Sequence, residues 1–158
     1  MKIYSFDWEE DDPIFNFKLL GLSSNLTKDY EFAFYLNKYC LFNLKRVDDQ
    51  VIMDQKIPYK FSVFKFYHLK TKQKIELISN YSFPEILKKD DFSLFEEVEN
   101  TKILMPEYKA FNYFLKFDFF LDEEFYVTLQ NLKMIKEYQY IDLENIKINN
   151  LENLILPT

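Results

Sequence analysis

Only one glycine, Gly21, occurs in this chain of 158 residues. Loops of the G-x-G-x-x-G and P-loop types, and the nucleophile elbow of hydrolases, use several glycines to bring the backbone close to a phosphate or to strain a turn. The sequence therefore excludes these nucleotide-binding and hydrolase classes. Gly21 itself follows a run of alternating apolar residues, where it predicts the end of a strand.

Aromatic residues make up 20% of the chain, with 18 Phe, 12 Tyr and 1 Trp. A chain of this length fits one domain and can bury roughly 68–70% of its unfolded surface without a disulfide or a metal. We therefore expect residues 1–158 to form a single domain whose core is rich in packed rings. The abundance of Phe, Tyr, Lys, Asn and Ile is equally typical of a genome poor in G and C, in which case the rings reflect codon supply.

The balance of charge is acidic, because 20 Lys and Arg face 26 Asp and Glu and give a net charge of -6. Specific nucleic-acid binding usually needs a basic face, so we expect no nucleic-acid partner. The sequence has no long uncharged apolar stretch, and its start turns acidic at Asp7, too early for a signal peptide. Cys40 is the only cysteine, which agrees with a reducing compartment. We expect a cytoplasmic protein without a membrane partner or a cofactor.

Two strand–helix–strand patterns occupy the first and last thirds of the chain. In the first, residues 14–20 alternate as a half-buried strand, residues 26–40 follow helical spacing, and residues 42–47 return to strand character. Asn25 or Thr27 is the expected N-cap of this helix. The first third therefore predicts a βαβ-like unit.

The last third repeats this order, with a strand over residues 111–120, a helix that begins at Asp122 and a strand over residues 138–143. Glu123 and Glu124 follow Asp122 in the first turn, where the helix dipole favours negative charge. A second βαβ-like unit is therefore expected at this end of the chain.

Between the two units, residues 60–67 and 74–79 alternate as the strands of a β-hairpin, whose turn contains no Gly and predicts a longer loop. Residues 82–101 show no single period and predict irregular structure with a helical turn. Together the patterns predict an α+β fold with a mostly antiparallel sheet and two packed helices. Ferredoxin-like βαβ units that flank the hairpin are the candidate architecture. We expect the apolar residues of 147–156 to cover a sheet edge or a partner.

Two segments in the last third, Ile103–Glu107 and Phe111–Lys116, carry a recognisable motif. They resemble the bacterial family that is named for its IPExxxVDY motif. The residues that match the motif are Pro106, Glu107 and Tyr113. Met105, Phe111 and Asn112 stand where the motif has Ile, Val and Asp. The resemblance extends to Gly21–Ser24, Asp29–Tyr30, Tyr35–Lys38, Arg46–Asp49 and Glu152–Ile155.

That family has no assigned activity, so the resemblance implies a cytoplasmic bacterial protein of about this length and nothing catalytic. The amide of Asn112 cannot replace the proton affinity or the charge of a carboxylate, so the motif does not predict a general base here. We interpret the motif as structural, with Pro106 ending a strand, Glu107 capping or pairing, and Tyr113 packing inward.

Isolated reactive groups give little indication of catalysis. His68 has no second His with which to share a metal or complete a triad, and a single Cys40 is typical of a small buried hydrophobe. The acidic run over residues 9–12 lacks the spacing and the Gly of a calcium loop, and is typical of a solvated turn. We therefore predict no catalytic residue and no metal ligand.

The best local candidate for a ligand or partner site is the loop of Ser23, Ser24 and Asn25, where a strand leads into a helix N-terminus. Free N–H groups and hydroxyls at such a place can hold a small anion. Ordinary helix capping explains the same residues, so both interpretations stay open.

Three functions remain open. The first, which we take as the prediction, is a non-enzymatic protein-interaction module, a homodimer or an adaptor, because the chain combines apolar excess with no catalytic chemistry. The second is a small-ligand-binding regulatory domain with its ligand near Ser23, Ser24 or an interface. The third is an enzyme that uses carboxylates such as Glu107 and Asp118, which requires them to converge in a cleft.

Overall fold

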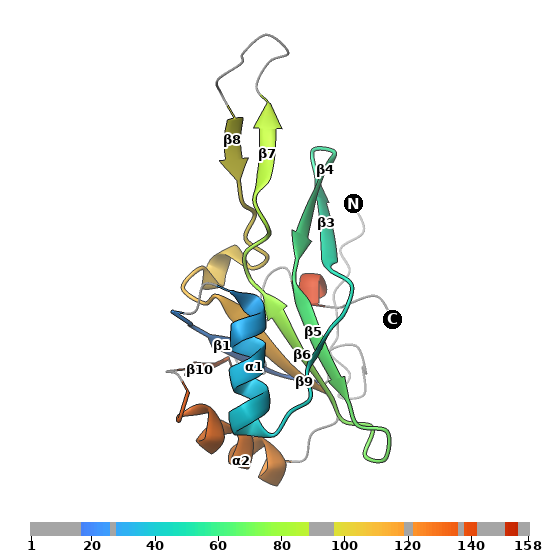
Figure 1. Cartoon of the computed structure of the whole chain (residues 1–158), viewed down its shortest axis with the longest axis vertical. Coiled ribbons are helices and arrows are strands. Elements are labelled where there is room, and N and C mark those ends of the chain that lie inside the picture. The colour runs from blue at the N-terminus through green and yellow to red at the C-terminus, as the bar shows by residue number, and fades with distance from the viewer. Residues whose placement is uncertain are drawn as a thin grey trace, which may run out of the picture.

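The computed structural model describes residues 17–25, 28–88, 97–118, 122–135, 138–141 and 151–154. Within these residues the chain forms one six-stranded sheet, two α-helices, two separate β-hairpins and two short 3-10 helices (Figure 1). The sheet is antiparallel throughout. The predicted α+β fold with a mostly antiparallel sheet and two helices is thus confirmed.

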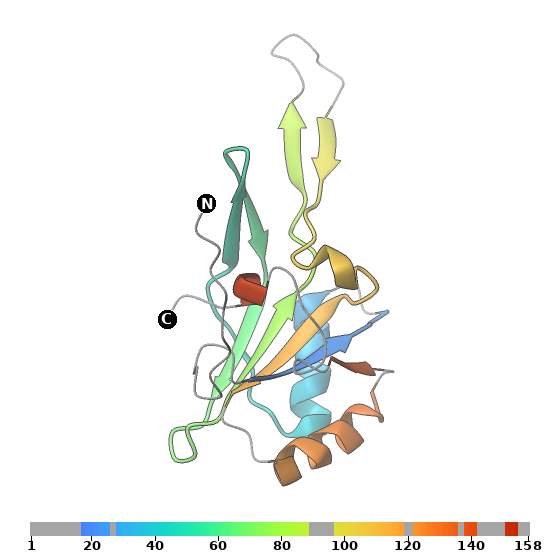
Figure 2. The same cartoon turned by 180° about the vertical axis from the view of Figure 1, so that it is seen from behind.

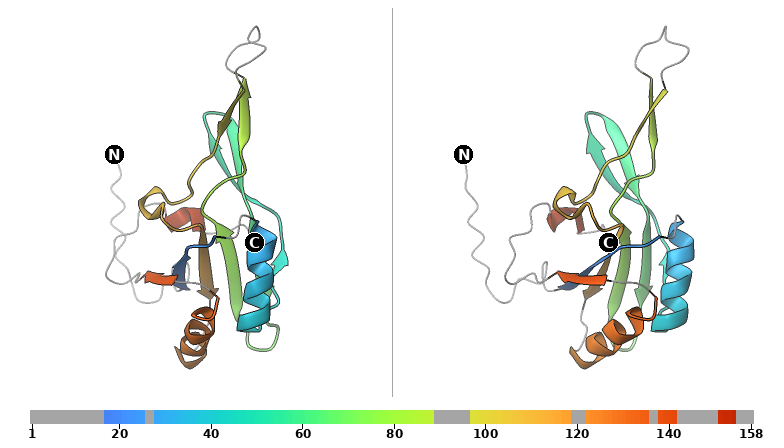
Figure 3. Two further views of the ribbon diagram at one scale, coloured as in Figure 1. Left: turned by 60° about the vertical axis from the view of Figure 1, so that its left-hand side comes forward. Right: turned by 90° about the vertical axis from the view of Figure 1, so that its left-hand side faces the viewer.

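The strand order in the sheet is β10-β1-β9-β6-β5-β2. Its strands are β1 (Phe17–Leu22), β2 (Lys45–Arg46), β5 (Val63–Tyr67), β6 (Lys74–Ser79), β9 (Tyr113–Asp118) and β10 (Tyr138–Ile141). The helices α1 (Asp29–Cys40) and α2 (Asp122–Leu132) lie on one face (Figures 1 and 3). The 3-10 helices η1 (Pro106–Tyr108) and η2 (Leu151–Leu154) lie on the opposite face, as Figure 2 shows.

Four strands and both helices have the ferredoxin-like arrangement. β1 and β6 run parallel with β9 between them, and β9 and β10 run parallel with β1 between them. Helix α1 lies on the path from β1 to β6, and α2 joins β9 to β10, so each helix belongs to a split βαβ unit. Strands β5 and β2 extend this core beyond β6.

The strand that completes the first unit is β6, not residues 42–47 as the sequence pattern predicts. Of those residues only Lys45–Arg46 pair, at the far edge of the sheet. The side-chain amide of Asn37 explains the difference, because it donates to the Leu44 carbonyl at 3.1 Å and accepts from the Leu44 N–H at 2.8 Å. A strand at Leu44 would need the same backbone groups for its ladder.

The predicted end of β1 at Gly21 is also wrong. Gly21 pairs with Phe114 on one side and Gln139 on the other, and the strand continues to Leu22. A Cβ at Gly21 would lie 2.5 Å from the ring of Phe111. Glycine is therefore present because a ring crosses the strand closely, and not because the chain turns.

The N-cap position of helix α1 lies three residues after Asn25 and one residue after Thr27, the two predicted caps. This position is Lys28, which makes no side-chain capping bond, so neither Asn25 nor Thr27 is the N-cap. The Asp29 carboxylate instead accepts the N–H of Tyr30 at 2.8 Å. A carboxylate at this end of the helix is favourable to the dipole.

The two separate hairpins, here called the arms, were not predicted. They are β3 (Gln50–Asp54) with β4 (Ile57–Phe61), and β7 (Glu85–Lys88) with β8 (Glu97–Asn100). The first arm turns at Gln55 and Lys56, whose φ angles are 47° and 66°. Hairpin turns with positive φ at both central residues usually contain Asn-Gly, so this turn lacks the sequence signal that would have predicted it. The second arm falls in the segment that was predicted to be irregular.

The predicted hairpin is confirmed as β5 paired with β6, except that β5 begins at Val63 and the predicted strand residues 60–61 belong to β4. Its turn contains Lys72 with a φ of 58° and has the expected extra length. At the end of the chain, Leu154 is fully buried in the core on the η2 side of the sheet. The apolar end thus covers a sheet face in residues 151–154, whereas residues 147–150 and 155–156 lie outside the described residues.

The core has two layers, because alternate residues of each strand point to opposite faces of the sheet. On the helix side, Phe117 packs edge-on against Phe125 of α2 at 5.2 Å, and Tyr113 packs against Phe32 of α1 at 4.8 Å. On the other side, the residues of η1, η2 and the first arm cover the sheet. Neither helix in the described ranges has the length and apolarity that a membrane crossing requires.

Candidate functional site

A cavity of about 540 Å³ lies at the end of the sheet where α1 begins and the second arm leaves the body. The side chains that line it include four serines and three tyrosines, and we call it the hydroxyl cavity. These residues are Ser24, Ser62, Ser79, Ser82, Tyr30, Tyr81 and Tyr113. A volume of this size is typical of sites for small molecules.

The floor of the hydroxyl cavity is formed by Ser62, Ser79 and Tyr113. Ser79 of β6 and Tyr113 of β9 are cross-strand partners, and the Ser79 N–H donates to the Ser62 carbonyl at 3.0 Å. The antiparallel register therefore places side chains from three distant parts of the sequence next to one another.

The phenol of Tyr113 is neutral over the physiological pH range. Burial and the neighbouring Asp29 carboxylate raise its pKa to about 12. Both causes disfavour the phenolate. Tyr113 can therefore donate a hydrogen bond into the hydroxyl cavity but does not act as a base.

The rim of the hydroxyl cavity contains the predicted loop. Ser24 and Asn25 line the cavity, whereas Ser23 is exposed and donates to the Ala110 carbonyl at 2.9 Å. The Ser24 N–H donates to the side-chain oxygen of Asn112 at 2.7 Å. Asn112 thus holds the loop in place, and any role for the loop in binding a ligand remains a prediction.

The motif segment is tied to the sheet by Asn80, a residue that the sequence pattern did not single out. Its amide nitrogen donates to the carbonyls of Tyr108 and Phe111 at 3.0 and 2.9 Å, and its amide oxygen accepts from the Met105 N–H at 2.9 Å. Asn80 is fully buried. It therefore fixes the path of η1 behind the hydroxyl cavity.

The motif residues have separate positions. Pro106 does not end a strand but is the first residue of η1, where its missing N–H costs nothing. Glu107 is exposed on η1, outside the hydroxyl cavity. Tyr113 packs inward as predicted.

Glu107 and Asp118 do not converge in a cleft. Glu107 precedes the start of β9, whereas Asp118 is the last residue of that strand and pairs with Lys74 at 3.2 Å. Six strand residues span roughly 20 Å, so the two carboxylates lie near opposite ends of β9.

His68 accepts the Thr71 N–H in the β5–β6 turn at 3.2 Å. Within the described ranges no three His, Cys, Asp or Glu gather as metal ligands, and the acidic run over residues 9–12 lies outside them.

A second cavity of about 410 Å³ lies between the end of α1 and the start of α2. Cys40 lines it but is 7% exposed, and burial raises the pKa of its thiol to about 12. A thiol with that pKa is almost fully protonated at neutral pH, so it is a poor nucleophile.

Charged side chains meet on the face of the sheet opposite the helices. Glu76, which is 1% exposed, lies 3.3 Å from both Lys116 and Lys65. Lys116 also donates to the Leu154 carbonyl at 3.3 Å. This group therefore attaches η2 to the sheet, which is a structural role.

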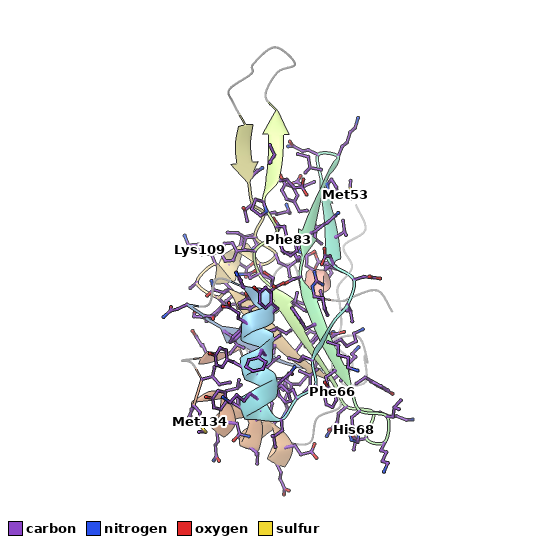
Figure 4. The ribbon with its side chains drawn as sticks, viewed as in Figure 1. Met53, Phe66, His68, Phe83, Lys109 and Met134 are labelled. Carbon is purple, nitrogen blue, oxygen red and sulfur yellow. The ribbon has the colours of Figure 1, made fainter. Side chains whose placement is uncertain are left out.

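The arms carry exposed apolar side chains. They project from the same end of the sheet in every view (Figures 1 to 3). Val51, Met53 and Ile86 on the arms are 46%, 62% and 58% exposed. Phe83 lies where the second arm leaves the body, close to the start of α1 (Figure 4).

The arms are braced against each other at their bases. The Phe83 N–H donates to the Lys60 carbonyl at 2.8 Å, and the Asn100 amide donates to the Tyr59 hydroxyl at 2.8 Å. Farther along the first arm, Lys102 pairs with Asp54 at 2.8 Å. The arms are thus held in position at their bases.

A comparison of the chain with protein-family models, with curated proteins and with solved structures finds no match.

Proposed function

We propose that this protein is a non-enzymatic interaction module that forms a homodimer through its first arm. The observation that supports the proposal is the outward face of that arm. Val51 and Met53 point the same way on β3, and their cross-strand partners on that face are Lys60 and Pro58. All four are exposed, so the arm presents apolar surface to solvent.

The geometry of β3 supports a second copy as the partner. Among the described residues β3 pairs with β4 alone, and an unpaired strand edge is a template for strand addition. In an antiparallel pair of two β3 strands centred on Ile52, Val51 of one copy stands opposite Met53 of the other. Such an isologous contact is self-complementary, as two-fold symmetry requires.

A cytoplasmic location and membership in the IPExxxVDY family belong to the same proposal. The single cysteine supports the first and the motif around Pro106 and Tyr113 supports the second.

Light scattering across a wide concentration range tests the dimer. We expect the mass of the wild-type chain to approach twice that of the monomer, and the double variant Val51→Lys with Met53→Lys to remain a monomer, because like charges then face each other across the contact. Leu69→Lys is the matched control, since Leu69 is 84% exposed in the β5–β6 turn at the opposite end of the sheet.

All three substitutions are at exposed positions and should change stability by only about 0.5 kcal/mol or less. A wild-type protein that stays monomeric at high concentration, or a double variant that dimerises as well as the Leu69→Lys control, would contradict the proposed interface.

A further inference from the structure

Two largely buried side chains that line the hydroxyl cavity have hydroxyls without a protein partner. Ser62 and Tyr113 are 3% and 7% exposed, and both line the cavity. Neither hydroxyl forms a hydrogen bond with any residue that the structure describes. Neither oxygen is among the described side-chain atoms that are both buried and unpaired, so both are accessible to solvent in the cavity. Both hydroxyls can therefore donate to and accept from a polar molecule that enters the cavity.

The neighbouring hydroxyls add donors and acceptors at the same end of the sheet. Ser79 exchanges hydrogen bonds with the backbone of Tyr81 at 2.7 and 3.3 Å, and the hydroxyl of Ser82 accepts from the Lys102 N–H at 2.8 Å. A hydroxyl can donate once and accept twice. The floor and wall therefore retain hydrogen-bonding capacity of both kinds.

The charges at the rim favour a neutral ligand. Lys28 and Asp29 are one cation and one anion, and both already have protein partners. The Lys28 ammonium lies 5.6 Å from the centre of the Tyr30 ring, and the Asp29 carboxylate accepts the Tyr30 N–H. The carboxylate of Asp29 would repel a phosphate group, and the ammonium of Lys28 would repel a polyamine.

Exposed rings supply the apolar part of the cavity wall. Tyr30 and Phe83 are 55% and 44% exposed and line the hydroxyl cavity from α1 and from the root of the second arm. Ring faces of this kind pack well against the C–H face of a cyclic polyol. Hydroxyls on one side and rings on another match a molecule with both kinds of surface.

We infer that the hydroxyl cavity binds a neutral polyhydroxylated small molecule, a saccharide or a cyclic polyol of up to disaccharide size. Ser62, Ser79 and Tyr113 hold its hydroxyl groups, and Tyr30 and Phe83 pack against its ring. This binding site is separate from the β3 dimer contact and does not depend on it.

Saturation-transfer NMR on the full chain tests this inference with glucose, maltose and myo-inositol as probes. We expect transfer to at least one of them at millimolar concentration, and none to glycine or inorganic phosphate. Direct detection of contact is needed, because sugars also stabilise proteins by being excluded from their surfaces.

The variants Ser62→Ala and Tyr113→Phe should each weaken that binding about tenfold, as the loss of one hydrogen bond to a ligand predicts. Tyr126→Phe is the matched control, because Tyr126 is 63% exposed on α2 and is not among the lining residues. It should bind as the wild type does. Ser79→Ala replaces either variant if that variant fails to unfold cooperatively.

Three outcomes would overturn the inference. Absence of transfer to every sugar and polyol would remove the site. Equal transfer in the variants and the wild type would place the sugar elsewhere on the molecule. Transfer to glycine or phosphate in place of the sugars would show that the ligand class is wrong.

Discussion

At the scale of single residues, Gly21 has no room for a side chain. A Cβ there would lie 2.5 to 2.8 Å from three atoms of the Phe111 ring. That ring cannot move away freely, because Tyr108 and Phe114 pack against it with centroids at 6.2 and 6.4 Å. The lack of a side chain at Gly21 is therefore part of the core packing.

We expect Gly21→Ala to lower the free energy of unfolding by about 1–3 kcal/mol, as overpacking of a close-packed core does. Urea denaturation measures the change. The double variant Gly21→Ala with Phe111→Leu should lose less than the sum of the two single variants, because the smaller side chain makes room for the methyl group. Strict additivity would show that the two residues do not interact.

At the scale of elements, the first arm has a backbone that its sequence does not favour. Gln55 and Lys56 both have a left-handed conformation, which costs a residue with a side chain roughly 1–2 kcal/mol. The arm is kept because Ile52 and Ile57 pack against the core and because Tyr59 is buried in it. Packing thus overrides local preference in this element.

Replacing Lys56 by Gly should therefore stabilise the protein by about 1 kcal/mol, seen as a rise in Tm. Lys70→Gly is the matched control, since Lys70 lies in the other exposed turn and is not among the residues with positive φ. It should leave Tm unchanged or lower it, because Gly increases the entropy of the unfolded chain. A lower Tm for Lys56→Gly would contradict this interpretation of the turn.

The elements also show what the sequence can and cannot predict. Period-2 alternation found β1, β5, β6 and β9 because each has one face toward the helices and one toward the opposite core layer. The two arms were not predicted because neither sequence contains the Gly that usually signals a hairpin turn. In the site, the loop at Ser24 was found from its place before a helix, whereas Ser62 and Ser79 become neighbours only through strand register, which no local pattern reveals.

At the scale of the whole molecule, several groups hold their protons more tightly in the folded chain. Burial alone would lower the pKa of Lys74, but Glu76 and Asp118 raise it overall. The pKa values of Tyr113 and Cys40 are each raised to about 12. Above its ordinary pKa, each of these groups binds more protons in the folded state than in the unfolded state. Its contribution to the free energy of unfolding therefore falls as pH rises above that value.

Below pH 10, the ordinary pKa of a tyrosine, we expect the contribution of Tyr113 to the free energy of unfolding to be fully present. Between pH 10 and about 12 this contribution should fall progressively. Urea denaturation at a series of alkaline pH values measures this loss. Tyr113→Phe should show a shallower decline than the wild type, and Tyr126→Phe should decline as the wild type does. Equal slopes for all three proteins would mean that Tyr113 ionises equally easily in both states.

The position of β1 in the sheet has a consequence for how the protein reaches its fold. This strand lies near the middle of the ferredoxin-like core, yet both its neighbours, β9 and β10, come from the last third of the chain. During synthesis on the ribosome, β1 therefore leaves the exit tunnel long before either neighbour exists. Contacts so distant in sequence slow folding, and an apolar strand that waits for them is prone to aggregation. Newly made chains should depend on chaperones until β10 has emerged.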